Sequence, residues 1–253
     1  MSAEPVVVCE DVSLWYGSFQ ALDTVSVTVA LGEILGLIGP SGCGKSTLLR
    51  CLNRMNDGPT TRITGTLRVA GHDVQAAEAD VISLRRDVGM VFQRPNPLPL
   101  SIRDNILFGV RLHAPRTPRS VQDGLCEEAL RTVGLWEQVR DRLKEHAEGL
   151  SLEGRQKLCI ARLLPLKPKV LLMDEPCSAL DPSGTAAVEE LMAELRGTYT
   201  QVIVTHNMQQ ARRVSDRCSF MLMGQLVETA PTADLFERPG DERTGRYIEG
   251  RYG

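Results

Sequence analysis

Residues 39 to 47 read Gly39-Pro40-Ser41-Gly42-Cys43-Gly44-Lys45-Ser46-Thr47. This stretch matches the phosphate-binding loop pattern G-x-x-x-x-G-K-[ST] at every fixed position. The apolar run Ile34–Ile38 before it is typical of a buried strand, and Leu48–Leu52 after it continues as a helix. A strand, a Gly-rich turn and a helix N-terminus present free N–H groups to an anion. We therefore predict that these nine residues bind nucleotide phosphates, with Lys45 reaching the β- and γ-phosphates and the Ser46 hydroxyl ligating Mg²⁺.

The overall composition is that of an ordinary globular chain. Its 253 residues are 42% hydrophobic and carry a formal net charge of −3. This acidic balance provides no global positive field, so we predict no nucleic-acid partner. The apolar runs fall short of the roughly 20 residues that a membrane-spanning helix needs, so any membrane role comes through a partner.

Seven cysteines are scattered along the chain, without a C-x-x-C pair or a Cys/His cluster. An odd count without metal-ligand spacing favours reduced thiols in a cytosolic protein over a disulfide frame or a zinc site. Cys43 differs because it lies in the phosphate loop. It is either a small filler or a thiol whose pKa is lowered by the helix N-terminus.

Several short segments before residue 95 are rich in β-branched residues. We predict that they form antiparallel strands beside the strand that leads into the phosphate loop. These segments are Val6–Val8, Ser26–Val29, Leu67–Val69 and Val88–Phe92.

The composition changes at Arg94–Leu100, which contains three prolines and is incompatible with a regular helix. Beyond it, apolar residues recur at every fourth position from Val121 to Val133, as in an amphipathic helix. Pro165 predicts that a helix approaching it is shortened or kinked.

The second half of the chain alternates apolar and helical segments. Val170–Met173 and Gln201–Thr205 are strand-like, and Ala186–Leu195 between them has helical character, which indicates parallel βαβ units. We predict one α/β domain over residues 1–253, a P-loop NTPase with a RecA-like core. Residues 1–94 and 163–253 form the ATP-binding core with its antiparallel β subdomain, and residues 95–162 form an inserted α-helical subdomain.

Two carboxylates end the predicted strand at Val170–Met173. Asp174 is placed to hold Mg²⁺, directly or through a water, and Glu175 to accept a proton from the attacking water. The alternative is a solvated Asp-Glu pair that opens a loop. The phosphate loop upstream favours the functional interpretation.

The order of these motifs resembles that of nucleotide-binding subunits of ATP-binding-cassette (ABC) transporters over essentially the whole chain. Gln93 follows a strand where that family has its Q-loop glutamine, and Ser178–Asp181 resembles the D-loop. His206 stands at the family's switch histidine, and Tyr16 matches the aromatic that stacks on adenine.

The resemblance implies a role for each of these residues. Gln93 would sense the metal and the attacking water, and His206 would bind the γ-phosphate and hold Glu175 in place. Asp181 would serve the dimer interface beside the nucleotide. The alternatives are a surface amide, a structural histidine and a packing aromatic at Tyr16. The predicted catalytic residues are thus Lys45, Gln93, Glu175 and His206, and the predicted metal ligands are Ser46, Gln93 and Asp174.

The chain departs from the family at its signature, Leu-Ser-Gly-Gly-Gln. The aligned residues are Leu150-Ser151-Leu152-Glu153-Gly154, so Leu152 and Glu153 replace both signature glycines while Ser151 remains. In the family this segment caps the γ-phosphate of ATP bound to the opposite subunit. A carboxylate about 4 Å from a phosphate charge costs on the order of a few kcal/mol at an effective dielectric near 20. We therefore hypothesise that a homodimer hydrolyses ATP slowly.

Several long strings are similar to the ATP-binding subunits of high-affinity phosphate importers. The resemblance implies ATP-driven uptake of inorganic phosphate by a peripheral subunit on the cytoplasmic side of the cell membrane. The implied partners are a second ATPase subunit, two membrane-spanning permease subunits and an extracytoplasmic phosphate-binding protein. The permease would dock between Gln93 and Phe108. The matching strings are Gly89–Ile102, Asp104–Leu112, Asp174–Pro182, Thr205–Gln210 and Gly250–Gly253.

Other functions stay open at this point. A hydrolysis-impaired regulatory cassette follows if Leu152 and Glu153 disable the composite site, although Glu175 and His206 argue against full loss. An importer of another solute is equally compatible with the chemistry, since the ATPase subunit does not touch the solute. A DNA-repair or translation cassette lacks support, because such proteins usually show paired cassettes, coiled coils or basic arms. A small-molecule kinase would not need the Gln, Asp and His elements together.

Overall fold

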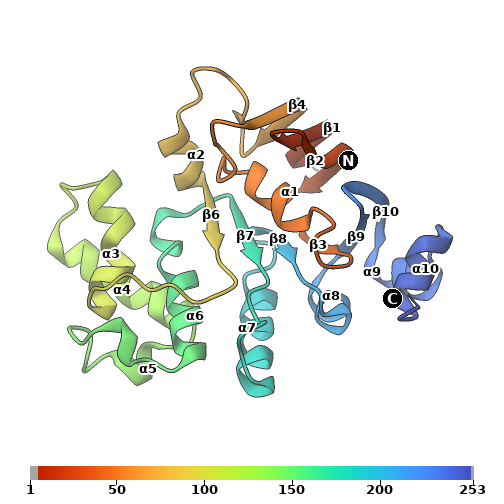
Figure 1. The fold of residues 1–253 in the computed structure, drawn as a ribbon. Coiled ribbons are helices and arrows are strands. Elements are labelled where there is room, and N and C mark those ends of the chain that lie inside the picture. Colours follow the sequence, from red (N-terminus) through yellow and green to blue (C-terminus); the bar gives the residue numbers. More distant parts are fainter. Residues whose placement is uncertain (1–4, 252–253) are drawn as a thin grey trace.

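The computed structural model describes residues 5–251. Two sheets and a set of helices make up this part of the chain (Figure 1). The strands are β1 (Pro5–Tyr16), β2 (Phe19–Ala30), β3 (Ile34–Ile38), β4 (Thr61–Val69), β5 (His72–Asp73), β6 (Val88–Val91), β7 (Val170–Asp174), β8 (Thr200–Val204), β9 (Arg217–Leu222) and β10 (Gln225–Pro231). The helices are α1 (Lys45–Cys51), α2 (Val81–Asp87), α3 (Ile102–His113), α4 (Arg119–Thr132), α5 (Trp136–Val139), α6 (Leu152–Ala161), α7 (Pro182–Glu194), α8 (Met208–Val214), α9 (Thr232–Glu237) and α10 (Glu242–Ile248).

The larger sheet has the order β10-β9-β3-β8-β7-β6, and all of its pairs are parallel except β10 with β9. Every residue of β3, β7 and β8 is buried. Strand β3 and residues Val170–Met173 of β7 are apolar, as expected where both faces of a parallel sheet are covered. Strand β8 buries Thr200 and Gln201 before its apolar run Val202–Val204. Along β7, Val170 and Leu172 pack into one core cluster while Leu171 and Met173 pack into the other.

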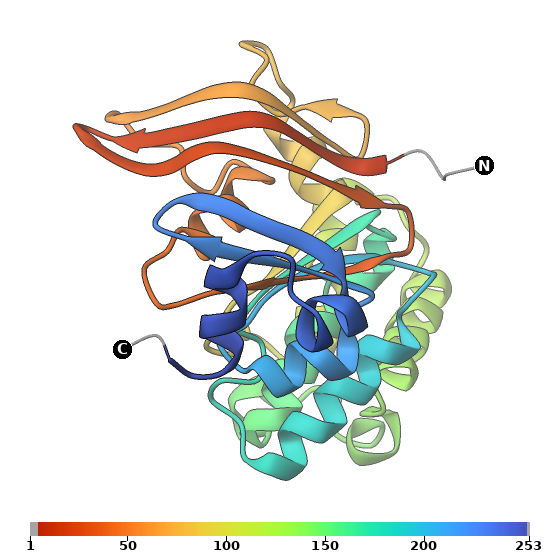
Figure 2. The same cartoon turned by 90° about the vertical axis from the view of Figure 1, so that its right-hand side faces the viewer.

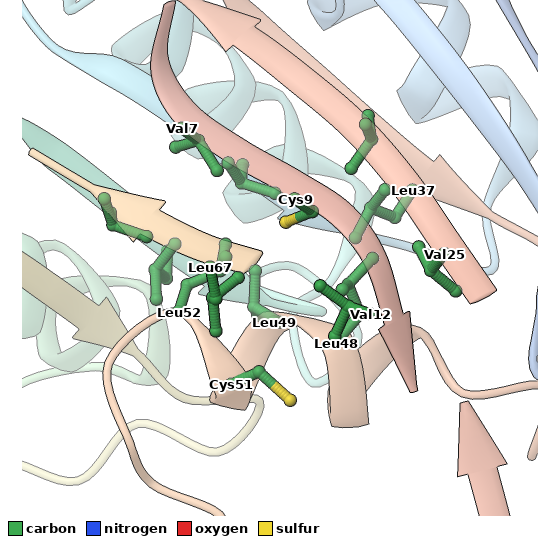
Figure 3. Close-up of a cluster of buried hydrophobic side chains, with 14 of the residues drawn as sticks. Val7, Cys9, Val12, Val25, Leu37, Leu48, Leu49, Cys51, Leu52 and Leu67 are labelled. Atoms are coloured by element: carbon green, nitrogen blue, oxygen red, sulfur yellow. The ribbon is translucent and has the colours of Figure 1, made fainter. Parts of the chain in front are cut away.

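The smaller sheet is antiparallel, with the order β2-β1-β4-β5. It lies above the larger sheet, and the helices α3 to α8 lie on the opposite side (Figure 2). Helix α1 fills the space between the sheets. Figure 3 shows Leu48 and Leu49 of α1 beside Val12 of β1 and Leu67 of β4. The helix that follows the phosphate loop is thereby fixed from both sides.

The helices α3 to α6 gather at one side of the larger sheet, next to β6 and β7 (Figure 1). The predicted amphipathic helix is α4, whose Ala129 and Leu130 are buried. Helix α6 ends at Ala161, and a single 3₁₀ turn over Leu164–Leu166 contains Pro165. The expectation of a shortened helix is therefore confirmed.

The predicted fold class is confirmed, but the prediction for Val88–Phe92 is wrong in one respect. Strand β6 pairs in parallel with β7 in the larger sheet and is not part of the antiparallel sheet. Val88 to Val91 are all buried, which is typical of a parallel strand covered on both faces. The prediction grouped this segment with the antiparallel strands that precede it in the chain, because β-branched content does not distinguish parallel from antiparallel pairing.

The proline-containing segment between β6 and α3 forms neither helix nor strand. Asn105 of α3, which is fully buried, holds this segment in place. Its carboxamide accepts from the Leu98 N–H at 2.8 Å and donates to the carbonyl oxygens of Leu98 at 3.1 Å and Ser101 at 3.0 Å. The segment is thus fixed through side-chain to backbone bonds in place of regular secondary structure.

Candidate functional site

The predicted site residues follow four neighbouring strands of the larger sheet. The phosphate loop follows β3, His206 lies just after β8, Glu175 follows β7 and Gln93 lies just after β6. These strands are adjacent in the order β3-β8-β7-β6 and all run parallel. Their carboxyl ends therefore meet at one edge, where open α/β sheets bind ligands.

The phosphate loop bends closely over the neighbouring strand β9. Gly39 has a φ of +148°, and a Cβ at this position would stand 2.2 Å from the carbonyl oxygen of Met221. Gly44 precedes α1 in a left-handed conformation with φ +105°. Side chains at these two positions would be strained or would clash, so the backbone path of the loop requires glycine.

Lys45 is almost completely buried beneath this loop. Its Nζ donates to the carbonyl oxygens of Gly39 at 2.7 Å and Pro40 at 2.8 Å. These acceptors are neutral, so they orient the ammonium group without neutralising its charge. The loop therefore holds a positive charge suited to an anionic ligand.

Ser46 and Asp174, two of the predicted metal ligands, lie in contact. The Ser46 hydroxyl donates to one oxygen of the buried Asp174 carboxylate at 2.7 Å. The Arg50 guanidinium donates to the other oxygen at 3.1 Å. Hydroxyl and carboxylate oxygens are ligands that Mg²⁺ prefers, so this pair fits a magnesium site.

Arg50 is a site residue that the sequence analysis missed. Ser46 and Arg50 are four residues apart in α1 and share one helix face, which is why both reach Asp174. The i, i+4 spacing after the serine that was predicted to ligate Mg²⁺ was the signal available in the sequence.

Glu175 is the centre of a second group. Its Oε2 lies 3.1 Å from the Gln93 Nε2, which donates to it, and 3.0 Å from the His206 Nδ1. Glu175 adopts a φ of +49°, which is uncommon for a residue with a side chain and costs on the order of 1–3 kcal/mol. Its N–H donates to the Val204 carbonyl at 2.9 Å, which helps to hold the strained backbone in place.

Tyr16 ends β1, and a little over a third of its surface is exposed. Partial burial raises the pKa of Tyr16, and a hydrogen bond with the Thr47 side chain opposes that shift. The aromatic ring is therefore tied to the end of the phosphate loop with part of its surface open. This placement is compatible with stacking on a base.

The segment that differs from the family signature lies at the start of α6. The Ser151 hydroxyl accepts from the Gly154 N–H at 3.0 Å and caps the helix. Leu152 is 44% exposed, and Glu153 forms an ion pair with Lys157 at 2.7 Å. The carboxylate of Glu153 thus has a partner within its own helix.

Asp181 caps the neighbouring helix α7, where its carboxylate accepts from the Gly184 N–H at 2.7 Å. The stem of Glu153 packs beside Gly184, so the starts of α6 and α7 are in contact. The side-chain hydrogen bonds of Ser151 and Asp181 thus go to their own helices. Neither residue joins the two groups around Asp174 and Glu175.

The hypothesis of a lowered pKa at Cys43 is wrong. Burial raises the pKa of the Cys43 thiol, and the nearby Lys45 only partly opposes this shift. The cost of desolvating a thiolate therefore exceeds the stabilisation expected at a helix N-terminus. Cys43 has the small-filler role that the sequence left as its alternative.

Helices long and apolar enough to cross a bilayer are absent from residues 5–251.

The chain matches the family model described as ABC transporter over residues 22–178. Its structure is similar to cbiO1 from Clostridium perfringens, part of the ABC transporter complex cbiONQ, with a TM-score of 0.79 and 24% identity over 98% of this chain and 97% of that one. It is also similar to the ATP-binding cassette MJ0796, in a dimeric post-hydrolysis state bound to ADP and Pi, with a TM-score of 0.75 and 26% identity over 89% of this chain and 98% of that one.

The fold thus defines a P-loop NTPase of mixed α/β architecture. The family match spans more than half of the chain, so the chain belongs to the ABC transporter family. It is an ABC ATPase domain, a class that binds ATP.

We expect the alkylation rate of Cys43 in the native chain to keep rising up to about pH 9, above the ordinary thiol pKa of roughly 8.5. A raised pKa leaves little thiolate at neutral pH, and each increase in pH adds more. Iodoacetamide labelling, followed by mass spectrometry of the Cys43 peptide, measures the profile. The urea-unfolded chain is the control, and a native rate that levels off below about pH 8 would contradict the prediction.

Proposed function

We propose that this chain is the ATP-hydrolysing subunit of a membrane importer. The observation that carries this proposal is the shared contact of Gln93 and His206 with the Glu175 Oε2. This group follows the same strand, β7, that supplies Asp174 to the Ser46 pair. A base is thus held one residue away from a magnesium-binding carboxylate.

In this mechanism Glu175 accepts a proton from a water molecule while the water oxygen attacks the γ-phosphorus. The bond from the γ-phosphorus to the β–γ bridging oxygen breaks, and ADP leaves with that oxygen. His206 and Gln93 orient Glu175 and the water, and Lys45 binds the β- and γ-phosphates. Ser46, Asp174 and Gln93 would hold Mg²⁺, and the bound ion would supply charge neutralisation on the phosphates.

We propose that two copies of the chain enclose two ATP molecules. Ser151 and Asp181 would act across that interface, and Tyr16 would stack on the adenine. The dimeric state of the similar cassette MJ0796 supports this arrangement. Within each copy, residues 95–162 would form the helical subdomain, and residues 1–94 and 163–253 would form the ATP-binding core.

We propose that two permease subunits dock beside α3, which would place the chain at the cytoplasmic side of the membrane as a peripheral subunit. Phe108 and Leu112 lie one turn apart on this helix and are 46% and 65% exposed. Leu100, just before the helix, is also partly exposed. Large apolar side chains clustered on a surface are typical of interaction sites.

The substitution Glu175→Gln should reduce the steady-state rate of ATP hydrolysis by at least about 100-fold, because the amide does not accept the proton. ATP binding should persist, since the phosphate loop is unchanged. Lys45→Ala is the matched comparison and should weaken ATP binding itself. Undiminished turnover in Glu175→Gln would refute the assigned base.

The altered signature gives a second prediction. Replacing Leu152 and Glu153 together by glycine should raise turnover by about tenfold, the equivalent of 1.36 kcal/mol in the transition state. The glycines let the backbone approach the phosphate and remove a carboxylate from its vicinity.

Glu153→Gln separates these two causes, since it removes the charge and keeps the side-chain size. Turnover that stays at the wild-type level in the double glycine variant would refute the hypothesis of a slow homodimer. That result would favour a regulatory cassette only if the wild-type chain also binds ATP without hydrolysing it.

We propose inorganic phosphate as the transported solute, on the resemblance of the strings around Gln93, Asp174 and His206 to phosphate importers. Chemistry within the chain does not select a solute, because the solute passes through the permease. An extracytoplasmic phosphate-binding protein would deliver it. Another importer solute is the alternative.

Proteoliposomes that contain this chain, phosphate-importer permease subunits and the phosphate receptor should take up radiolabelled phosphate when ATP is supplied. Liposomes with Glu175→Gln in place of the wild-type chain should show no uptake. If uptake occurs only when the permease subunits and the receptor come from a sulfate or molybdate importer, the transported solute is a different one. The ATPase assignment would remain intact.

A further inference from the structure

Gln156 lies in the middle of α6, five residues after Ser151. Its side chain is completely buried. Its Nε2 donates to the Pro176 carbonyl oxygen at 2.8 Å and to the Phe92 carbonyl oxygen at 3.4 Å. One carboxamide therefore bridges two loops that are more than 80 residues apart in the sequence.

The two acceptors adjoin the hydrolytic group. Pro176 follows Glu175, and Phe92 precedes Gln93, while the side chains of Glu175 and Gln93 hydrogen-bond each other at 3.1 Å. Gln156 thus holds the backbone on both sides of a contact that the side chains make directly. The hydrogen bonds of Gln156, Gln93 and Glu175, together with the backbone that joins neighbouring residues, form one closed ring.

A primary amide is the group that this position requires. Its NH₂ group supplies two donors, which two carbonyl oxygens can use. A carboxylate of the same shape would place acceptor oxygens against carbonyl oxygens, and an apolar side chain would leave both carbonyls without this donor. The Gln156 Oε1 has no hydrogen-bond partner among residues 5–251, so burying the amide has a cost of its own.

Helix α6 therefore adjoins two parts of the proposed dimer, the nucleotide of the opposite subunit and the Gln93–Glu175 pair of its own subunit. Its first turn carries Ser151, which faces the nucleotide of the opposite subunit in that proposal, and Gln156 lies about 7.5 Å further along the axis. A shift of α6 on closure would move the carbonyls of Phe92 and Pro176 with it. The hydrogen bonds of Gln156 thus connect the helix that begins at the signature segment with the loops that carry Gln93 and Glu175.

We infer that Gln156 is a positioning residue that fixes the Gln93–Glu175 pair relative to the signature segment. The inference rests on the proposed ATPase function. Gln156 does not touch ATP in this mechanism, so its loss should lower kcat and leave the ATP affinity nearly unchanged.

The test compares Gln156→Leu with Gln201→Leu. Gln201 is also completely buried, donates to one backbone carbonyl, that of Met192, at 2.8 Å, and also has an unpartnered Oε1. Both substitutions remove a buried amide of the same kind. Gln201 lies near the start of β8, away from the strand ends that carry the site.

Gln156→Leu should lower kcat for ATP by about tenfold or more, since small misplacements of reacting groups are costly. Its KM should stay within about twofold of wild type. Gln201→Leu should lose comparable thermal stability and keep its kcat below the melting temperature. Gln156→Glu, in which a carboxylate oxygen replaces the NH₂, should not restore kcat.

Hydrogen–deuterium exchange on the nucleotide-free chain provides a readout that does not need activity. Peptides that cover Phe92–Arg94 and Glu175–Ser178 should exchange faster in Gln156→Leu and at the wild-type rate in Gln201→Leu. Unchanged exchange in both peptides, or an equal loss of kcat in the two variants, would overturn the inference. A wild-type chain without ATPase activity would instead refute the proposed function, and the exchange result would still decide the role of Gln156.

Discussion

The arrangement of Asp174 and Glu175 depends on the position of β7 in the larger sheet. This strand lies between β8 and β6 and is buried at every residue. Its register places Asp174 opposite Val204, and the next N–H, that of Glu175, donates to the Val204 carbonyl. The strand end therefore fixes two consecutive carboxylates in different directions.

The backbone is left-handed at Glu175, directly after the end of β7. A continuing strand would place successive side chains on opposite faces of the sheet. Instead the chain turns at Glu175, with Asp174 directed to Ser46 and Glu175 directed to Gln93 and His206. The hydrogen bond from the Glu175 N–H to the Val204 carbonyl of β8 helps to hold this backbone in place.

Much of this fold could be predicted from the sequence. The phosphate loop was recognisable because glycine spacing and flanking apolar runs jointly specify a strand, a turn and a helix. Burial on both faces gave β7 its apolar run Val170–Met173 and β8 its apolar run Val202–Val204. The direction in which strands pair left no comparable pattern in the sequence, so β6 was assigned to the wrong sheet.

The parts of the site that escaped prediction depend on three-dimensional packing. Arg50 matters because it contacts Asp174, which is 124 residues away in the sequence, and Gln156 because two distant loops meet at its amide. The pKa of Cys43 was misjudged because the helix terminus was visible in the sequence while the burial that outweighs it was not. Contacts between residues far apart in sequence determine all three.

The contacts within α6 bear on how strongly Leu152 and Glu153 would each affect a phosphate bound beside them. Lys157 lies 2.7 Å from Glu153, and its side chain is mostly buried. A paired carboxylate presents less net charge to a phosphate than an isolated one, so the full Coulomb cost of a few kcal/mol is an upper bound. Leu152 has no such compensation, because its side chain is exposed where the family has glycine. Within the proposed dimer, the Glu153 charge would be reduced by its pairing with Lys157, whereas nothing in the contacts of α6 reduces the bulk that Leu152 adds.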